Sequence, residues 1–121
     1  MIATNIQQSK HLLELGLDPN TADMFYFSYG MFRPMKLHVG KILEDVVTGK
    51  RQWAIPAWSL SALLEVIPKE ELIDLSVSKD NYWFCSGVHF DTPTYSNPID
   101  AAYAQVKWLL EQGLIKKGDK Q

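Results

Sequence analysis

The chain has 121 residues, a formal net charge of −2 and hydrophobic residues at 46% of its positions. A chain of this size forms one domain around its own core, and this composition excludes a disordered chain, a coiled coil and a collagen-like repeat. The single cysteine, Cys85, excludes an internal disulfide. We therefore expect a single domain over residues 1–121, with a frayed tail at 116–121.

The first predicted element is a helix near the N-terminus. Thr4 and Gln7 have the spacing of a capping box, which predicts that the helix begins after Thr4. Gly16 is expected to end the helix in the left-handed conformation, and Leu17 to fold back as the hydrophobic contact of that cap. Residues 17–20 then predict a turn.

Aromatic residues dominate the next segment, Met24–Phe32, and this favours a strand. Alternate residues of a strand share a face, which gathers three rings: Phe25, Phe27 and Tyr29. The short segment Met35–Val39 is expected to pair with it as a hairpin. Residues 40–52 show no consistent period, and we interpret them as a strand fragment or a long loop.

The stretch Trp53–Trp58 is interpreted as the lead into a second helix, which begins at Trp58 or Ser59 and ends at Pro68. The apolar side of this helix follows helical spacing: Leu60, Leu63, Leu64 and Ile67.

A second hairpin follows. Strict alternation of apolar and polar residues over Leu72–Ser78 predicts a half-buried strand. After a turn at residues 79–81, Tyr82–Phe90 is expected to return as its partner strand, with a bulge at Gly87.

The last predicted element is a helix with clear signals at both ends. Asn97 is the expected N-cap, Pro98 the first helical residue and Asp100 a negative charge in the first turn. Gly113 is expected to close the helix. Helices and strands are thus mixed without a regular βαβ alternation. The sequence predicts an α+β fold, with a small, mainly antiparallel sheet covered on one face by about three helices.

One set of residues has the types needed for nucleophilic catalysis. Cys85, His89 and Asp91 share a parity, so an uninterrupted strand would place a thiol, an imidazole and a carboxylate on one side. Free cysteines are usually buried, and Gly87 interrupts the strand pattern, so we favour a structural role for all three.

No cofactor is expected, because the chain has no glycine-rich phosphate loop. No bound metal is expected either, because no Cys-x-x-Cys or His-Glu-x-x-His motif is present. The chain shows no signal-peptide pattern and no apolar run near the ~18 residues of a membrane span. We therefore expect a cytoplasmic protein without membrane contact.

The aromatic residues are the main candidates for a binding surface. The candidates for protein interaction are Phe25, Phe27, Tyr29, Trp53 and Trp58. A basic segment overlaps them in the chain, and its candidates for nucleic-acid contact are Arg33, Lys36, Lys41, Lys50 and Arg51. Aromatic rings stack on bases and cations follow a phosphate backbone, but aromatic rings are also ordinary core material.

Three segments carry a resemblance to known sequences: Gln8–Met24, Ile55–Pro68 and Asn97–Ile115. Together they resemble a group of short uncharacterised proteins of gut bacterial genomes, often found in prophage-like or mobile elements. The resemblance implies an accessory role in a bacterial or phage setting, and it carries no activity and no catalytic residue.

The function that the sequence favours is a non-catalytic protein-interaction or accessory module, which binds another protein or a second copy of itself. An alternative is a nucleic-acid-binding accessory protein that uses the basic segment 33–51. A further alternative is a small enzyme built on Cys85 and His89.

Overall fold

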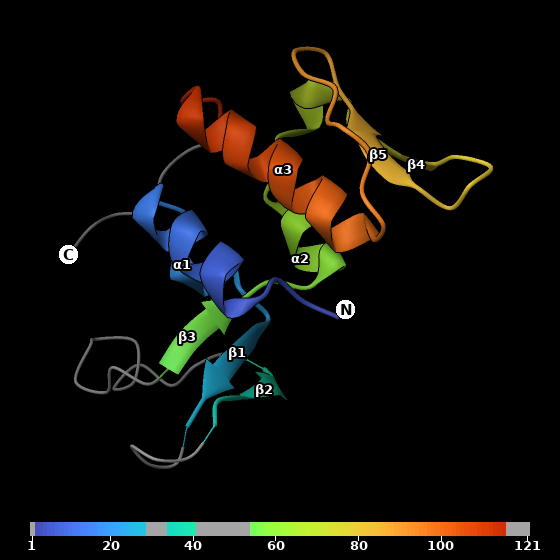
Figure 1. Ribbon diagram of the computed structural model, residues 1–121. Coiled ribbons are helices and arrows are strands. Elements are labelled where there is room, and N and C mark those ends of the chain that lie inside the picture. Colours follow the sequence, from blue (N-terminus) through green and yellow to red (C-terminus); the bar gives the residue numbers. More distant parts are fainter. Residues whose placement is uncertain (1, 29–33, 41–53, 116–121) are drawn as a thin grey trace.

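The computed structural model describes residues 2–28, 34–40 and 54–115 (Figure 1). Their elements, in chain order, are α1 (Ile6–Glu14), η1 (Pro19–Thr21), β1 (Met24–Phe27), β2 (Lys36–Val39), β3 (Ala54–Ala57), α2 (Leu60–Glu65), η3 (Lys69–Glu71), β4 (Asp74–Val77), β5 (Trp83–Ser86) and α3 (Pro98–Glu111). The predicted α+β class is confirmed. The strands, however, form two antiparallel sheets in place of the one expected, with orders β2-β1-β3 and β4-β5.

The first helix begins one residue later than predicted. Asn5 is the N-cap, and its side chain and that of Gln8 form the capping box. Thr4 is unavailable as a cap because its hydroxyl has two other contacts. It lies 2.8 Å from the hydroxyl of Ser9 and accepts a hydrogen bond from the backbone N–H of Trp58. A tertiary contact therefore moves the start of the helix.

The two glycine caps are confirmed. Gly16 and Gly113 have φ values of 96° and 74°, in the left-handed region that glycine adopts without strain. The backbone N–H of the next residue then reaches back into the last turn. Leu17 N–H donates to the Leu12 carbonyl at 3.0 Å, and Leu114 N–H to the Leu109 carbonyl at 2.8 Å. Both helix ends are thus set by local sequence.

The three-stranded sheet contains a strand that the sequence did not predict. β3 pairs with β1, in the segment that we had interpreted as a lead into α2. Pro56 argues against a central strand, but β3 lies at the edge of this sheet, where a proline is tolerated. The predicted pairing of β1 with the segment around β2 is confirmed. The part of the first predicted strand at 29–33 lies outside the described residues.

The second sheet is a hairpin that is shorter than predicted. β5 ends at Ser86, so Gly87 ends the strand and does not form a bulge within it. Gly87 lies in a narrow space against Ile73, which precedes β4, and Gln105 of α3. A Cβ atom there would lie 2.5 Å from Cδ1 of Ile73 and 3.0 Å from Nε2 of Gln105, and glycine alone fits without displacement.

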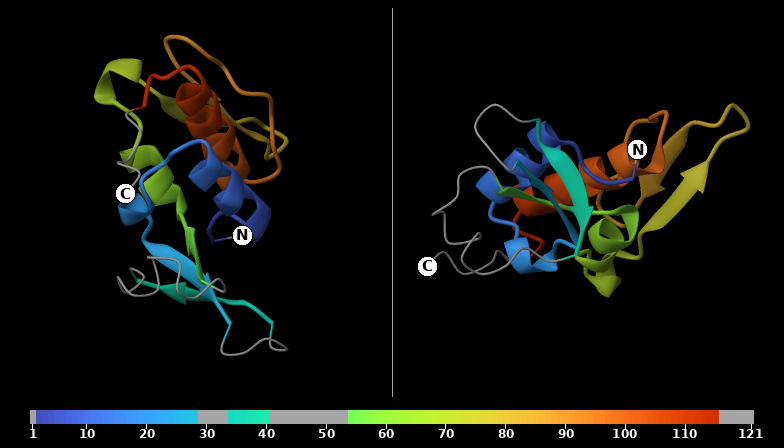
Figure 2. Two further views of the ribbon diagram at one scale, coloured as in Figure 1. Left: turned by 90° about the vertical axis from the view of Figure 1, so that its left-hand side faces the viewer. Right: turned by 90° about the horizontal axis from the view of Figure 1, so that it is seen from below.

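The three helices lie side by side, with the three-stranded sheet at one end of the group and the hairpin against α3 (Figures 1 and 2). This differs from the expected layer of helices over one sheet. The main core lies among the helices and β5, and its largest fully buried side chains include Trp58, Leu12, Leu63 and Leu109. A smaller cluster joins Ala3 of the N-terminal segment to Met24 of β1 and Ala57 of β3.

Candidate functional site

The thiol of Cys85 is not placed for catalysis. Its side chain is fully buried in the main core, and this burial raises the pKa of the thiol to about 11. A nucleophilic cysteine must be partly exposed and must ionise near neutral pH. The geometry therefore assigns Cys85 to the core.

The other two catalytic candidates have partners of their own. Nδ1 of His89 lies 2.8 Å from a carboxylate oxygen of Glu71, and a carboxylate oxygen of Asp91 accepts a hydrogen bond from the backbone N–H of Gly87. The shared parity with Cys85 is lost, because β5 ends at Ser86. Sequence reasoning missed the His89–Glu71 pair, which joins residues 18 positions apart with no motif between them.

Metal ligands do not gather in the described residues. Within residues 2–28, 34–40 and 54–115, no group of three or more histidine, cysteine, aspartate or glutamate side chains is placed to hold a metal ion.

Two of the predicted interaction residues share a surface with one of the predicted basic residues. Phe25 and Phe27 lie on one face of β1, as the alternation predicted, and the paired residues of β2 on that face are His38 and Lys36. The ring of Phe25 stacks on His38 with centroids 5.2 Å apart, and the ring of Phe27 meets it edge-on at 6.3 Å. We call these four residues the aromatic sheet face.

Of the remaining candidates for a binding surface, only Trp58 lies among the described residues, and its predicted role is wrong. Trp58 is fully buried, and its indole N–H donates to the hydroxyl of Thr21 at 2.9 Å, so it belongs to the core and not to an interaction surface. The position between β3 and α2 turns this side chain inward. The other candidates lie outside the described residues: Tyr29, Trp53, Arg33, Lys41, Lys50 and Arg51.

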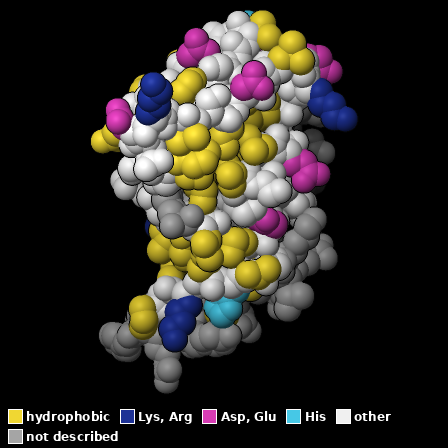
Figure 3. All heavy atoms as spheres, turned by 90° about the vertical axis from the view of Figure 1, so that its right-hand side faces the viewer, with side chains coloured by type: hydrophobic (Ala, Val, Ile, Leu, Met, Phe, Trp, Pro, Cys, Tyr) yellow, Lys and Arg dark blue, Asp and Glu magenta, His cyan; other side chains and the backbone are white. Residues whose placement is uncertain are grey.

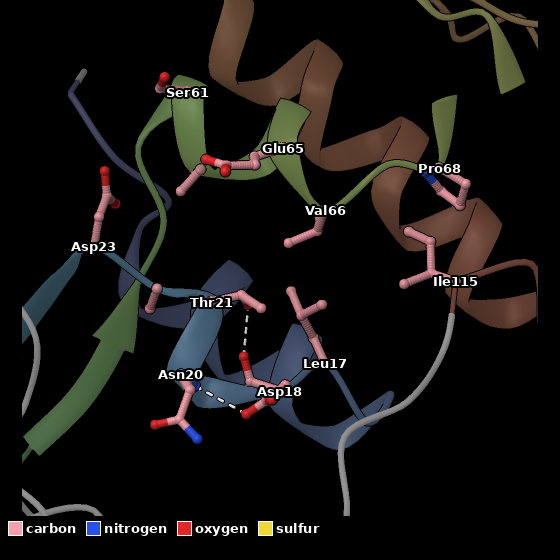
Figure 4. A pocket seen from close by; sticks show the side chains of 12 residues that line it. Leu17, Asp18, Asn20, Thr21, Asp23, Ser61, Glu65, Val66, Pro68 and Ile115 are labelled. Carbon is pink, nitrogen blue, oxygen red and sulfur yellow. Dashed lines mark hydrogen bonds between the residues drawn. The ribbon is translucent and has the colours of Figure 1, made fainter. Parts of the chain in front are cut away.

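A pocket of ≈ 520 Å³ lies between η1 and α2 (Figure 4). Leu17, Val66 and Ile115 point into it. Two of the carboxylates at its rim hold backbone in place. Asp18 accepts the N–H of Asn20, and Asp23 accepts the N–H of Ser59, the N-cap of α2. These carboxylates therefore have a structural use at the starts of η1 and α2.

The hairpin concentrates the exposed apolar surface. Among the described residues, seven large hydrophobic side chains are exposed, and four of them lie between positions 72 and 88. Their exposed fractions are 72% for Leu72, 48% for Val77, 49% for Tyr82 and 60% for Val88. Single exposed hydrophobic residues are ordinary, but a group of them on one small element marks a binding surface.

One edge of this hairpin is covered. On the far side of β5, Trp83 and Tyr95 exchange two backbone hydrogen bonds, of 2.7 and 2.8 Å. Cys85 likewise donates its N–H to the hydroxyl of Thr92 and accepts the N–H of Thr92 on its carbonyl. The outer peptide groups of β5 are therefore satisfied by residues 92–95.

The other edge is open. In the β4–β5 pair, Val77 lies opposite Trp83 and Leu75 lies opposite Cys85. In an antiparallel pair, the peptide groups alternate between the two sides of a strand, so those of Leu75 and Val77 point away from β5. No other backbone group among the described residues pairs with them. We call this the open β4 edge.

A groove runs beside the open β4 edge. Its volume is ≈ 310 Å³, and Lys69 is the one charged residue in its lining, which is Leu64, Ile67, Pro68, Lys69, Leu72, Ile73 and Leu75. The side of the molecule toward which the hairpin points carries a group of hydrophobic side chains with charged side chains around it (Figure 3). An unpaired strand edge beside an apolar groove is the geometry that accepts an extended peptide.

Comparison of the chain with protein-family models, with curated proteins and with solved structures finds no match. No helix among residues 2–28, 34–40 and 54–115 is long and apolar enough to cross a membrane.

Proposed function

We propose that this protein is a non-catalytic protein-interaction module whose docking surface is the open β4 edge. The observation that carries the proposal is the grouping of exposed hydrophobic side chains around a strand edge whose peptide groups have no partner. Native proteins usually protect such an edge with charge, proline or a covering segment. Here the edge residues are Asp74, Leu75, Ser76 and Val77, with one charge among four.

The mode of binding is strand addition. The peptide groups of Leu75 and Val77 would form the backbone hydrogen bonds, and the groove beside Leu72 and Ile73 would take one side chain of the bound strand. Backbone bonds of this kind provide affinity with little sequence preference, and the groove adds a preference for an apolar side chain.

The setting in which the module acts is also a proposal. The resemblance of Ile55–Pro68 and Asn97–Ile115 to short proteins of gut bacteria supports an accessory role in a bacterial or prophage-like element. We place that role in the cytoplasm, because a chain with a single cysteine cannot form an internal disulfide and so does not require an oxidising compartment.

A selection from a library of displayed random peptides tests this function. We expect enriched peptides to be extended, with apolar residues at alternate positions, and to protect the backbone N–H groups of Leu75 and Val77 from hydrogen exchange. A Val77→Pro variant removes one outward N–H without removing a β4–β5 bond, and it should lose the selected peptides. Enrichment of no peptides, or of peptides that bind the variant equally well, would contradict the proposal.

A second function, nucleic-acid binding, is favoured by the aromatic sheet face. Lys36 is exposed and pairs in register with Phe27, so a cation and two rings share one face of the sheet. That combination suits a single strand, whose bases stack on rings while the phosphates meet cations.

Fluorescence anisotropy of labelled single-stranded DNA and RNA at low salt tests this second function. A Lys36→Ala variant should weaken binding, whereas Lys69→Ala, an equal charge change on η3, should not. Absence of binding at low salt would exclude nucleic acid, because phosphate contacts are strongest there.

A further inference from the structure

The open β4 edge has a symmetry that bears on its partner. The two residues whose peptide groups point outward, Leu75 and Val77, lie on either side of Ser76. A second β4 placed antiparallel, with the two-fold axis at Ser76, sets Leu75 opposite Val77 of the second copy and Val77 opposite Leu75. Both outward residues of each strand are then paired, and four backbone hydrogen bonds form across the axis, two for each hydrogen-bonded pair.

Charge favours the same arrangement. Asp74 begins β4 and Lys79 follows its end, and both are exposed without an ion pair among the described residues. In this register Asp74 of one copy lies opposite Ser78 of the other, one residue before Lys79, so opposite charges meet near each end of the strand pair. Parallel pairing would instead set like charges side by side. Opposite charges near one another attract, whereas like charges directly opposite each other destabilise a strand pair.

The apolar surface is also self-complementary. Leu75 and Val77 project from the same face of β4, toward the side of Cys85 and Trp83. In the antiparallel arrangement, the two leucines and two valines form neighbouring cross-strand pairs on that face. The half-exposed side chain of Val77 then loses contact with water. Such apolar cross-strand pairs are the unit that stabilises a sheet.

We propose that the occupant of the open β4 edge is a second copy of this chain, which pairs its own β4 antiparallel about Ser76. The two hairpins form one four-stranded sheet in the order β5-β4-β4-β5. The inference rests on the proposed function, since it identifies the partner of the same docking surface. An isologous contact of this kind closes as a dimer and leaves no outer strand of the four-stranded sheet uncovered, because residues 92–95 cover β5 in each copy.

The first test is the mass of the protein in solution as a function of its concentration. By sedimentation or light scattering, the full chain should approach twice 13.8 kDa as its concentration rises from about 10 μM to about 1 mM, the behaviour of a small, transient interface. Val77→Lys should keep the protein monomeric, because a charged edge blocks pairing. Val39→Lys is the matched control, since it makes the same change at an exposed valine of β2, in the other sheet, and it should still dimerise.

The second test identifies the axis. Two Ser76 residues in this register form a non-hydrogen-bonded pair with Cα atoms ~4.5 Å apart, within the range of a disulfide. Ser76→Cys should therefore give a disulfide-linked dimer on mild oxidation. Ser78→Cys, which lies directly after β4 and away from the axis, should cross-link much less, and the native chain not at all, since Cys85 is fully buried.

Three results would overturn the inference. They are a monomeric mass at every concentration, a dimer that Val77→Lys leaves intact, and equal cross-linking of Ser76→Cys and Ser78→Cys. If the chain stays monomeric while displayed peptides still bind the open β4 edge, the second copy is excluded and the interaction module stands. If neither a second copy nor a peptide binds there, both proposals fail.

Discussion

The two sheets of this protein are held in the fold in different ways. In the three-stranded sheet, β1 is paired on both sides, and β3 is tied to the N-terminal segment where Thr4 and Trp58 exchange backbone and side-chain hydrogen bonds. In the hairpin, β5 is covered by residues 92–95 while β4 has an open edge.

In the hairpin, the contacts that hold the element in the fold and the surface proposed for binding lie on different parts of the element. The hairpin is anchored through Cys85, which is part of the main core, and through Trp83 and Leu75, which pack against that core. β4 stays in place without a second neighbouring strand, because it pairs with β5 and the core contacts of β5 hold the hairpin. Four of the seven exposed large hydrophobic residues among the described residues lie on or beside this hairpin.

The largest expected effect tests whether the two sheets belong to one cooperative unit. Trp58 joins β3 to α2 and is fully buried, so Trp58→Ala should lower the free energy of unfolding by about 3–5 kcal/mol. Hydrogen exchange should show faster opening in both sheets. Tyr82→Ala, on the exposed side of the hairpin, should change stability by no more than about 0.5 kcal/mol. A hairpin that keeps its protection in Trp58→Ala would mean that the two sheets unfold separately.

A smaller effect concerns the anchor of the hairpin and depends on pH. Burial raises the pKa of the Cys85 thiol from 9.0 to about 11, so the unfolded chain releases this proton first as the pH rises. The contribution of the neutral, buried Cys85 thiol to the free energy of unfolding is fully present below pH 9 and is lost as the pH rises toward 11. Since one pKa unit corresponds to about 1.4 kcal/mol, the loss should be about 2–3 kcal/mol.

Denaturant unfolding at a series of pH values measures this loss, with Cys85→Ala as the control. Burial also raises the pKa of Tyr26 and Tyr103, so the native protein and the Cys85→Ala variant both lose stability at high pH. The difference in unfolding free energy between them should change between pH 9 and pH 11. A constant difference would show that the thiol ionises alike in the folded and unfolded chains.

The smallest effect concerns the anchor of the three-stranded sheet. The hydroxyl of Tyr26 donates to the carbonyl of Thr4 at 2.8 Å, so Tyr26→Phe should cost about 1 kcal/mol of unfolding free energy. Hydrogen exchange should rise along Met24–Phe27 and not in the hairpin. Tyr82→Phe offers the same chemical change at a half-exposed ring of the hairpin and should have no measurable effect. Equal effects of the two changes would remove the distinction between the sheets.

The sequence predicted well wherever the signal was local. The glycine caps at Gly16 and Gly113 and the N-cap at Asn97 each depend on a few adjacent residues, and all three are confirmed. The alternation that placed Phe25 and Phe27 on one face is confirmed for the same reason. Period and cap chemistry act over one turn or one strand, within reach of the sequence.

The candidate site was predicted less well. The open β4 edge was not predicted, because the strand pattern of Leu72–Ser78 does not say which side of the strand is left unpaired. The burial of Trp58 was missed because its neighbours in the chain do not reveal the main core around it.

The sequence by itself determined the glycine caps of α1 and α3, the N-cap of α3, the shared face of Phe25 and Phe27 and the α+β class, because these follow from local backbone preferences and the spacing of apolar residues. Only the tertiary structure decided that β3 is a strand and that the Thr4 hydroxyl bonds to Trp58 and does not cap α1. It also decided that residues 92–95 cover β5 while β4 has an open edge. The physical reason is that a strand obtains its hydrogen bonds from distant segments. Whether an edge is satisfied therefore depends on where residues 92–95 come to lie, and no local pattern encodes it.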